Sequence, residues 1–149
     1  MTMESTAALV AFKAQFAGTM DLTPPVPPGF PVNVSGTGEA SYLGDSTNTA
    51  YVTFVEMMEC ENGPGFVVQN AGTLRSTEHT DDTITVAITD RPCPTGPNLY
   101  SGTSPFTVTG GTGRFAGATG HGSFTGTGDF AKLTFTYVFD GLISPPAGS

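Results

Sequence analysis

Apolar and polar residues alternate with a period of two along most of this chain, a pattern typical of β-strands that bury one face. In DTITVAIT, for example, Ile84, Val86 and Ile88 share one face, and threonines occupy the other. A helical period of 3.6 residues persists nowhere, and only 113–117 is expected to form a helical turn. The alternation predicts eight strands, near residues 9–20, 34–44, 49–58, 65–76, 82–89, 103–109, 118–127 and 132–141.

Short connections between these strands favour an antiparallel up-and-down arrangement, and eight strands are enough to close a barrel. Glycines interrupt several strands, at Gly36, Gly38, Gly120, Gly122 and Gly126. Such glycines fit a sheet that bends sharply or brings backbones close together. The proline-rich segments 23–31 and 91–98 are expected to be loops. The sequence therefore predicts one all-β domain over residues 1–149, an eight-stranded antiparallel β-barrel.

The charge balance narrows the function classes. The net charge is −8, with only 5 Lys and Arg among 149 residues. Nucleic acid and anionic lipid bind to basic surfaces, which so acidic a chain lacks. Neither is therefore expected as a partner. No apolar run approaches the roughly 18 residues of a membrane-spanning helix. The N-terminal MTMESTAALVAF has no basic n-region, so no signal peptide is predicted in the chain as given.

Two cysteines, Cys60 and Cys93, lie in turn-like segments. Taken alone, they fit one disulfide, two free thiols or half of a metal site, although no CxxC or paired histidine accompanies them. Strand order favours the disulfide, because the third and fifth strands of a meander end at the same rim, about 10 Å apart. Loops can close that distance to the ~5.5 Å between the α-carbons of a bridge. A bridge indicates an extracytoplasmic compartment; otherwise the sequence leaves the location unknown.

The glycine-rich stretch TVTGGTGRFAGATG, residues 107–120, would cradle a phosphate only if it opened a helix. The residues that follow, HGSFTG, have no helical pattern, the Walker lysine is missing and the Gly-x-Gly-x-x-Gly spacing is not met. We therefore interpret the stretch as a turn between two strands. No cofactor is predicted.

This turn, together with KLTFTYVFDGLI, resembles the carboxy-terminal half of the allene oxide cyclase barrel family and the related dirigent proteins. The resemblance is specific over 103–143 and looser over 34–58. It implies an eight-stranded antiparallel barrel, often a homotrimer, whose apolar cavity shapes a reactive hydrophobic substrate. The first strand differs, since the cyclases have an acidic residue and an asparagine in it, whereas here it offers Lys13 and Gln15 and no acidic residue before Asp21. The resemblance therefore implies the fold and a small hydrophobic ligand rather than one reaction.

Six residues are candidates for a ligand site. Glu56 interrupts the apolar stretch YVTFVEMM, and a regular strand would place it on the same face as Phe54. If that face lines the interior, Glu56 is a candidate catalytic acid or base, and if the other face does, Glu56 is solvated. The candidate ligand contacts are Phe54, Tyr51, Arg75, Phe135 and Tyr137.

Two further polar groups carry weaker signals. TEHTDD at 77–82 gathers acidic side chains and a histidine, but it lacks the ligand spacing of a calcium loop, so a solvated acidic turn is expected. His121 has no serine or cysteine nucleophile in a recognisable motif. Neither a metal site nor a catalytic triad is predicted.

Two function classes stay open. The first is a barrel that binds a small apolar or aromatic molecule, with cyclase, isomerase or stereochemistry-directing activity as an extension of that binding. The second is a non-enzymatic structural or interaction protein with a filled barrel, for which eleven phenylalanines suffice. An apolar cavity of ligand size favours the first class, and a packed core favours the second.

Overall fold

The computed structural model describes residues 8–21 and 31–147, which form strands, turns and one short 3₁₀ turn. The elements are β1 (Val10–Asp21), β2 (Pro31–Ala40), β3 (Gly44–Cys60), β4 (Gly63–Ser76), β5 (Thr83–Asp90), β6 (Cys93–Gly96), β7 (Leu99–Thr112), η1 (Gly113–Phe115), β8 (Gly120–Asp129) and β9 (Thr134–Ile143). Across these ranges there is no helix long and apolar enough to cross a membrane.

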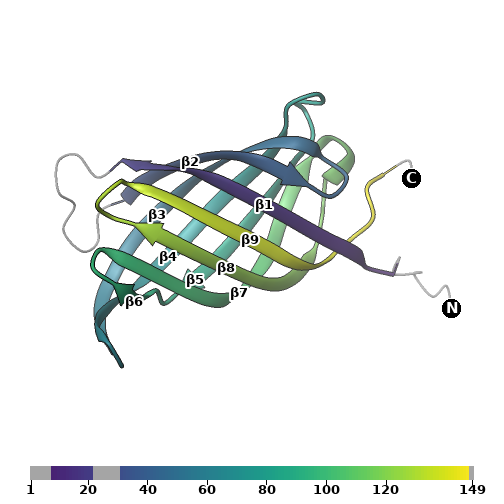
Figure 1. Cartoon of the computed structure of the whole chain (residues 1–149). Helices are drawn as coiled ribbons and strands as arrows, with labels where there is room; N and C mark the ends of the chain where they lie inside the picture. The colour runs from purple at the N-terminus through teal and green to yellow at the C-terminus, as the bar shows by residue number, and fades with distance from the viewer. Residues whose placement is uncertain (1–7, 22–30, 148–149) are drawn as a thin grey trace, which may run out of the picture.

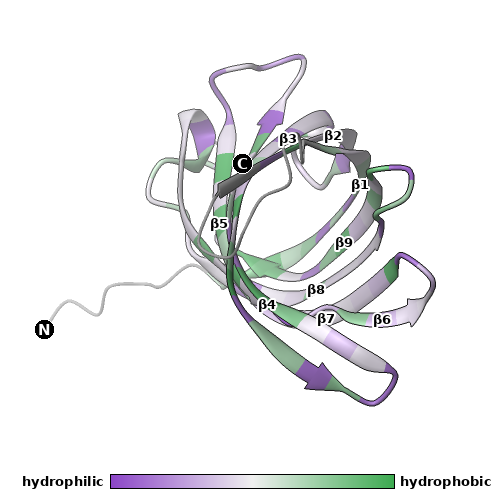
Figure 2. Ribbon diagram, turned by 90° about the vertical axis from the view of Figure 1, so that its left-hand side faces the viewer, coloured by the Kyte–Doolittle hydropathy of each residue, from purple (hydrophilic) through white to green (hydrophobic). Residues whose placement is uncertain are grey.

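The strands form one antiparallel sheet that closes on itself (Figure 1). Around the ring the order is β5, β4, β3, β2, β1, β9, β8, β7, and β7 returns to pair with β5. Figure 2 views this ring from the left-hand side of Figure 1. The predicted eight-stranded up-and-down barrel is confirmed.

A short additional strand, β6, lies outside the ring and pairs with β7. The expectation that 91–98 is a loop is therefore wrong for Cys93–Gly96, which forms a hairpin with the start of β7. Pro94 is tolerated there because an edge strand does not need a continuous hydrogen-bond ladder. The other predicted proline-rich loop, 23–31, lies outside the described residues except for Pro31, where β2 begins.

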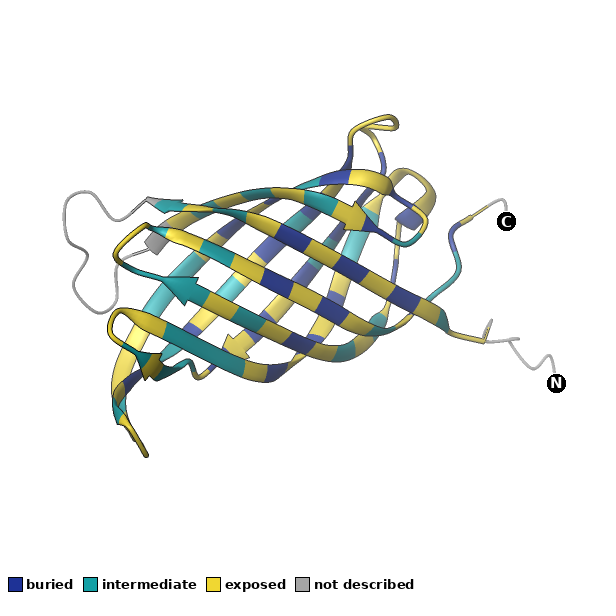
Figure 3. Cartoon of the chain, in the orientation of Figure 1, coloured by how far each residue is buried: buried dark blue, intermediate teal, exposed yellow. Residues whose placement is uncertain are grey.

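Buried and exposed residues alternate along the strands, as the sequence pattern predicts (Figure 3). In β5, Ile84, Val86 and Ile88 are buried, whereas Ala87 and Thr89 are exposed. All eight ring strands contribute buried hydrophobic side chains to the interior. Removing this apolar surface from water, at about 25 cal/mol per Å², is the main force that holds the barrel together.

The two ends of the barrel differ in packing. We call the end with the β3–β4 turn, the β5–β6 link and the β8–β9 turn the mouth, and the opposite end the base. At the base, the fully buried side chains of Phe12, Leu74, Ile84, Phe115 and Ile143 fill the interior. The base is therefore a packed plug, and any open interior lies towards the mouth.

The glycine-rich stretch between β7 and β8 builds this plug. Gly113 has a φ of +63°, in the left-handed region that favours glycine, and a Cβ there would collide with the Asp82 carboxylate. The next residue, Arg114, binds Asp82, and Phe115 inserts into the base with 2% of its surface exposed. The predicted turn therefore also closes the base of the barrel.

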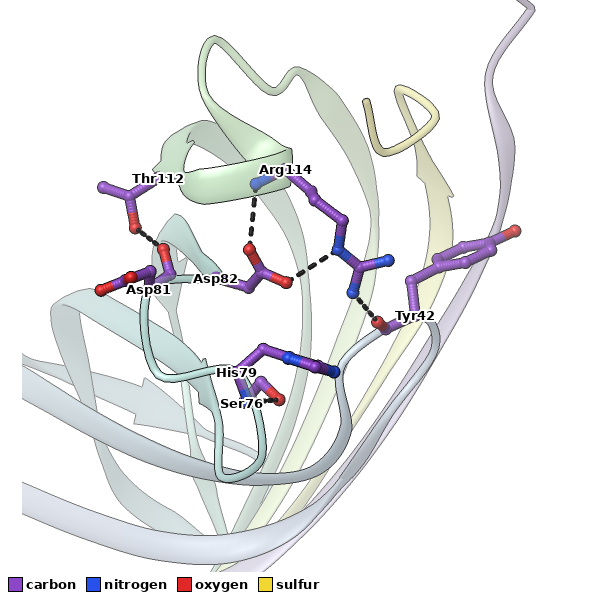
Figure 4. Close-up of polar contacts among 7 residues, drawn as sticks. All are labelled: Tyr42, Ser76, His79, Asp81, Asp82, Thr112 and Arg114. Carbon is purple, nitrogen blue, oxygen red and sulfur yellow. Dashed lines mark hydrogen bonds and ion pairs between the residues drawn. The ribbon is translucent and has the colours of Figure 1, made fainter. Parts of the chain in front are cut away.

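Arg114 links three turns at the base through one ion pair and two further hydrogen bonds (Figure 4). The Arg114 backbone N–H donates to Asp82 Oδ1 (3.0 Å), its Nε donates to Oδ2 (2.8 Å), and its Nη2 donates to the Tyr42 carbonyl (3.0 Å). The two donors to Asp82, the Arg114 backbone N–H first and its Nε second, hold the pKa of the Asp82 carboxyl below its ordinary value. The expectation of a solvated acidic turn therefore holds for the exposed residues 77–81 but not for Asp82, which Arg114 buries and pairs.

Cys60 and Cys93 form a disulfide with 5.8 Å between their α-carbons, as the strand order predicts. The bridge joins the end of β3 to the start of β6 at the mouth. Gly65 leaves room for it, since a Cβ there would lie 2.5 Å from Cys60 Sγ and 2.6 Å from the Pro92 carbonyl oxygen. The disulfide therefore fixes the segment after β5 against the long β3–β4 hairpin.

Candidate functional site

A cavity of about 130 Å³ occupies the mouth half of the barrel and is partly open to solvent. Aliphatic side chains of β2 to β5 form much of its wall, among them Val34, Val52, Val68, Val86 and Ile88. The volume is close to the ~150 Å³ of an engineered apolar cavity that binds benzene. A ligand the size of a six-membered ring therefore fits, and a larger one must extend through the mouth.

Aromatic side chains of β8 and β9 form the facing wall. In the ring order, β9 is four strands from β4 in either direction, so the two strands lie opposite each other. Phe135 stacks on Tyr137 with ring centroids 4.9 Å apart, and Phe124 contacts Tyr137 at 5.8 Å. All three side chains line the cavity. This wall offers an aromatic ligand stacked or edge-to-face contacts, worth about 0.5–1.5 kcal/mol each beyond area burial.

Tyr137 is the polar-tipped residue of this aromatic wall. Its hydroxyl donates a hydrogen bond to Asn48 Oδ1, and Asn48 Nδ2 in turn donates to the Thr73 carbonyl (3.1 Å). Burial raises the pKa of the Tyr137 hydroxyl above its ordinary value. Tyr137 therefore stays protonated near neutral pH, and its hydrogen bond to Asn48 holds its ring in the aromatic wall.

A buried carboxylate, Asp90, lines the cavity from the end of β5. Asp90 is 8% exposed, and its Oδ1 accepts hydrogen bonds from Ser104 Oγ (2.7 Å) and the Arg91 backbone N–H (2.9 Å). Its Oδ2 has no hydrogen-bond partner among the described residues. Every buried side-chain oxygen or nitrogen of those residues has a hydrogen-bond partner. Because Oδ2 has none, it is not buried and is accessible to solvent. Asp90 therefore presents one free carboxylate oxygen.

Asn70 lies beside Asp90 in the same wall. β4 and β5 pair Asn70 with Ile88 and Val68 with Asp90, so the two polar residues are diagonal neighbours, about 7–8 Å apart. Asn70 lines the cavity, and its amide has no hydrogen bond to another residue in the described ranges. We call Asn70 and Asp90 the polar patch; Asn70 lies on β4, opposite β9, and Asp90 lies on β5, two strands from β8 in the ring.

Four aromatic rings gather at the mouth. Phe66 contacts Phe54, Tyr100 and Phe130 with ring centroids 5.5, 5.2 and 6.1 Å apart, and Tyr100 stacks on Phe130 at 4.9 Å. The Phe66 N–H also donates to the Pro92 carbonyl (3.1 Å), beside the disulfide. Phe54, Tyr100 and Phe130 line the cavity, so this mouth cluster forms part of its entrance.

The structure brings three of the six sequence candidates together in the cavity, namely Phe54, Phe135 and Tyr137. Tyr51 is 59% exposed on β3, and Arg75 is exposed near the base on β4. Both occupy solvent-facing positions of the alternation, so their side chains do not line the cavity.

Glu56 is exposed and has no place in the cavity wall. The face of Phe54 does line the interior, but a β-bulge between Phe54 and Glu56 inserts Val55 as an extra residue. A bulge of this kind shifts the alternation, so Glu56 lies opposite Val67 instead of continuing the inward series. The expectation that Glu56 supplies an acid or base inside the barrel is therefore corrected.

Sequence reasoning missed three polar residues that line the cavity, Asn48, Asn70 and Asp90. The alternation could have revealed two of them. Asp90 lies two residues after the buried Ile88, and Asn70 lies two residues after the buried Val68, so both fall on the inward-facing side of their strands. A polar residue on the buried parity of a strand needs a partner inside the protein or a ligand.

The arrangement can hold an apolar ring against the aromatic wall and offer it an amide and one negative charge. No group of three or more His, Cys, Asp or Glu side chains within 8–21 and 31–147 is placed to hold a metal ion. Comparisons with protein-family models, with curated proteins and with solved structures found no match.

Proposed function

We propose that this barrel binds a small apolar or aromatic molecule in the cavity of its mouth half. The observation that carries the proposal is a cavity of about 130 Å³ in a barrel whose base is fully packed. The side chains around this cavity are largely aliphatic and aromatic, so a small apolar molecule gains about 25 cal/mol for each Å² of its surface that leaves water there.

The resemblance of residues 103–143 to the allene oxide cyclase and dirigent barrels agrees with this function, since their cavities shape reactive hydrophobic substrates. A cyclase, isomerase or stereochemistry-directing activity would extend the binding, because a confined cavity restricts the shapes that a substrate adopts. A shared fold supports binding of such a substrate and does not assign a reaction to this barrel.

Calorimetric or NMR titration with toluene tests the proposal. We expect saturable binding to the wild type and its loss in Gly128→Leu, because Gly128 lines the cavity and a Cβ there makes only ordinary contacts, 3.5 Å or more. The control is Ser123→Leu, which places the same side chain at an exposed position of β8. Absence of saturable binding to the folded wild type, or equal binding by both variants, would refute the proposal.

The packed base favours one alternative, a structural protein whose barrel is simply a stable scaffold. The fully buried Phe12, Phe106, Phe115 and Phe139 fill much of the interior. Under this alternative the cavity holds only water, and no probe of benzene size binds in the titration.

The disulfide supports a location outside the reducing cytoplasm as a further part of the proposal, because such bridges persist in oxidising compartments. Alkylation of protein isolated without reductant tests this part. Two alkylated thiols in the intact mass would contradict it.

A further inference from the structure

We infer that the ligand of the cavity is a small organic cation, an aromatic or alkyl ammonium whose charge pairs with Asp90. The inference deepens the proposed function and rests on it. Asp90 is the only formally charged side chain among the described residues that line the cavity. It therefore decides which charge the cavity accepts.

Asp90 lacks a cationic partner among the described residues. No lysine, arginine or histidine of the described chain forms an ion pair with it, and the neighbouring Arg91 contributes its backbone N–H while its side chain is exposed. A buried carboxylate without a counter-charge is costly, so such groups are normally paired. A ligand cation would supply the missing charge.

The local structure holds the carboxylate in one orientation. Ser104 Oγ and the Arg91 N–H bind Oδ1, which leaves Oδ2 as the free acceptor. Gly102 makes room for this arrangement, because a Cβ there would lie 2.8 Å from Asp90 Oδ1. Oriented donors on one oxygen and an accessible second oxygen suit a charge-assisted hydrogen bond from an ammonium group.

Aromatic rings near Asp90 suit the same ligand. Tyr100 lies two residues from Gly102 on β7, about 6.7 Å along the strand, and its ring packs on Phe130. Both rings line the cavity, and ring faces attract organic cations within about 6 Å. An aromatic ammonium ligand would thus place its charge between Asp90 and the mouth cluster and its ring against the aromatic wall.

The charge of the whole molecule favours a cation as well. The net charge is −8, and the β3–β4 hairpin at the mouth carries the exposed Glu56, Glu59 and Glu61. Against these, Arg91 and Lys132 are the cations near the mouth in the described chain. A negative field around an entrance raises the local concentration of cations and their association rate.

The test compares two probes of nearly equal size, benzylammonium and neutral benzyl alcohol, by calorimetric titration at pH 7. We expect the wild type to bind benzylammonium at least about tenfold more tightly than benzyl alcohol, the gain of one charge-assisted hydrogen bond. Asp90→Asn keeps the shape and an acceptor oxygen, so benzyl alcohol should still bind while the preference falls to about one.

Two further variants make the test specific. Glu56→Gln removes the same unit of charge outside the cavity and should keep the preference. Gly102→Ala adds a methyl group that displaces the Asp90 carboxylate, and it should weaken benzylammonium binding more than benzyl alcohol binding. This variant replaces Asp90→Asn if the latter does not fold.

The outcomes separate the inference from the proposed function. If the folded wild type binds neither probe nor toluene, the proposed function fails and the inference fails with it. If benzyl alcohol or toluene binds and benzylammonium binds no more tightly, the inference is overturned while the proposed function stands. A preference that survives both Asp90→Asn and Gly102→Ala overturns the assignment to Asp90.

Discussion

The Cys60–Cys93 disulfide should supply a large part of the stability of this barrel. The bridge closes a loop with a sequence separation of 33 residues. In the chain-entropy model, a loop of this length stabilises the folded state by about 3.7 kcal/mol, because it restricts the unfolded chain. For a chain near 150 residues, each 1 kcal/mol shifts Tm by roughly 2–4 °C, so the bridge corresponds to about 10 °C.

The double variant Cys60→Ala/Cys93→Ala removes the bridge without leaving a thiol. We expect guanidinium unfolding, followed by circular dichroism, to show a lower midpoint and a free energy of unfolding reduced by about 2–4 kcal/mol. Reduced and alkylated wild type is the control and should lose a similar amount. A loss below about 1 kcal/mol in both samples would refute the loop-closure reasoning.

Three further predictions concern the base, the cavity wall and the sheet. The folded-state pKa of Asp82 is lowered, so its contribution to stability is complete above the unfolded pKa of about 3.9 and is lost as the pH falls through the folded value. The stability difference between wild type and Asp82→Asn should therefore shrink in acid-unfolding series below pH 4. Tyr137→Phe leaves Asn48 Oδ1 without its donor and should cost about 1–3 kcal/mol in denaturant unfolding. Gly38→Ala would drive a Cβ into the backbone of β1 and should cost at least about 1–3 kcal/mol in Tm-derived stability, whereas Gly128→Ala, whose Cβ makes only ordinary contacts, should be nearly neutral.

Each of these predictions has a contrary result. A deficit of Asp82→Asn that is the same at pH 3 and pH 7 would show that the ionised carboxylate is not what stabilises the base. Full stability of Tyr137→Phe would show that the Asn48 oxygen finds another donor. Equal effects of the two glycine substitutions would contradict the close approach of β1 and β2.

The fold was largely predictable because a closed barrel imposes the same two-residue period on every strand. Ile84, Val86 and Ile88 on one face of β5 are enough to identify that strand and its buried side. The exception is β6. Its stability comes from pairing with β7 and from the bridge at Cys93, and the alternation of apolar and polar residues predicts neither.

The site was less predictable, for two physical reasons. The two-residue alternation predicts which face a side chain occupies only while the strand pairs without a bulge. The bulge at Val55 interrupts the pairing of β3 with β4 just before Glu56. Contacts between distant strands, such as Tyr137 with Asn48 or Asp90 with Ser104, depend on the register of the whole ring. The topological argument for the disulfide succeeded because it needed only strand order and direction.

The most direct test of a ligand-binding cavity is the contact between a bound probe and the cavity wall. In a toluene-saturated sample, we expect intermolecular nuclear Overhauser effects from toluene to the methyl groups of Val86 and Ile88 and to the Tyr100 ring, which line the cavity. The methyl groups of Val138 and Leu142, exposed on the outer face, should show none. Contacts only to Val138 and Leu142, or none to any of these groups, would contradict a ligand-binding cavity inside the barrel.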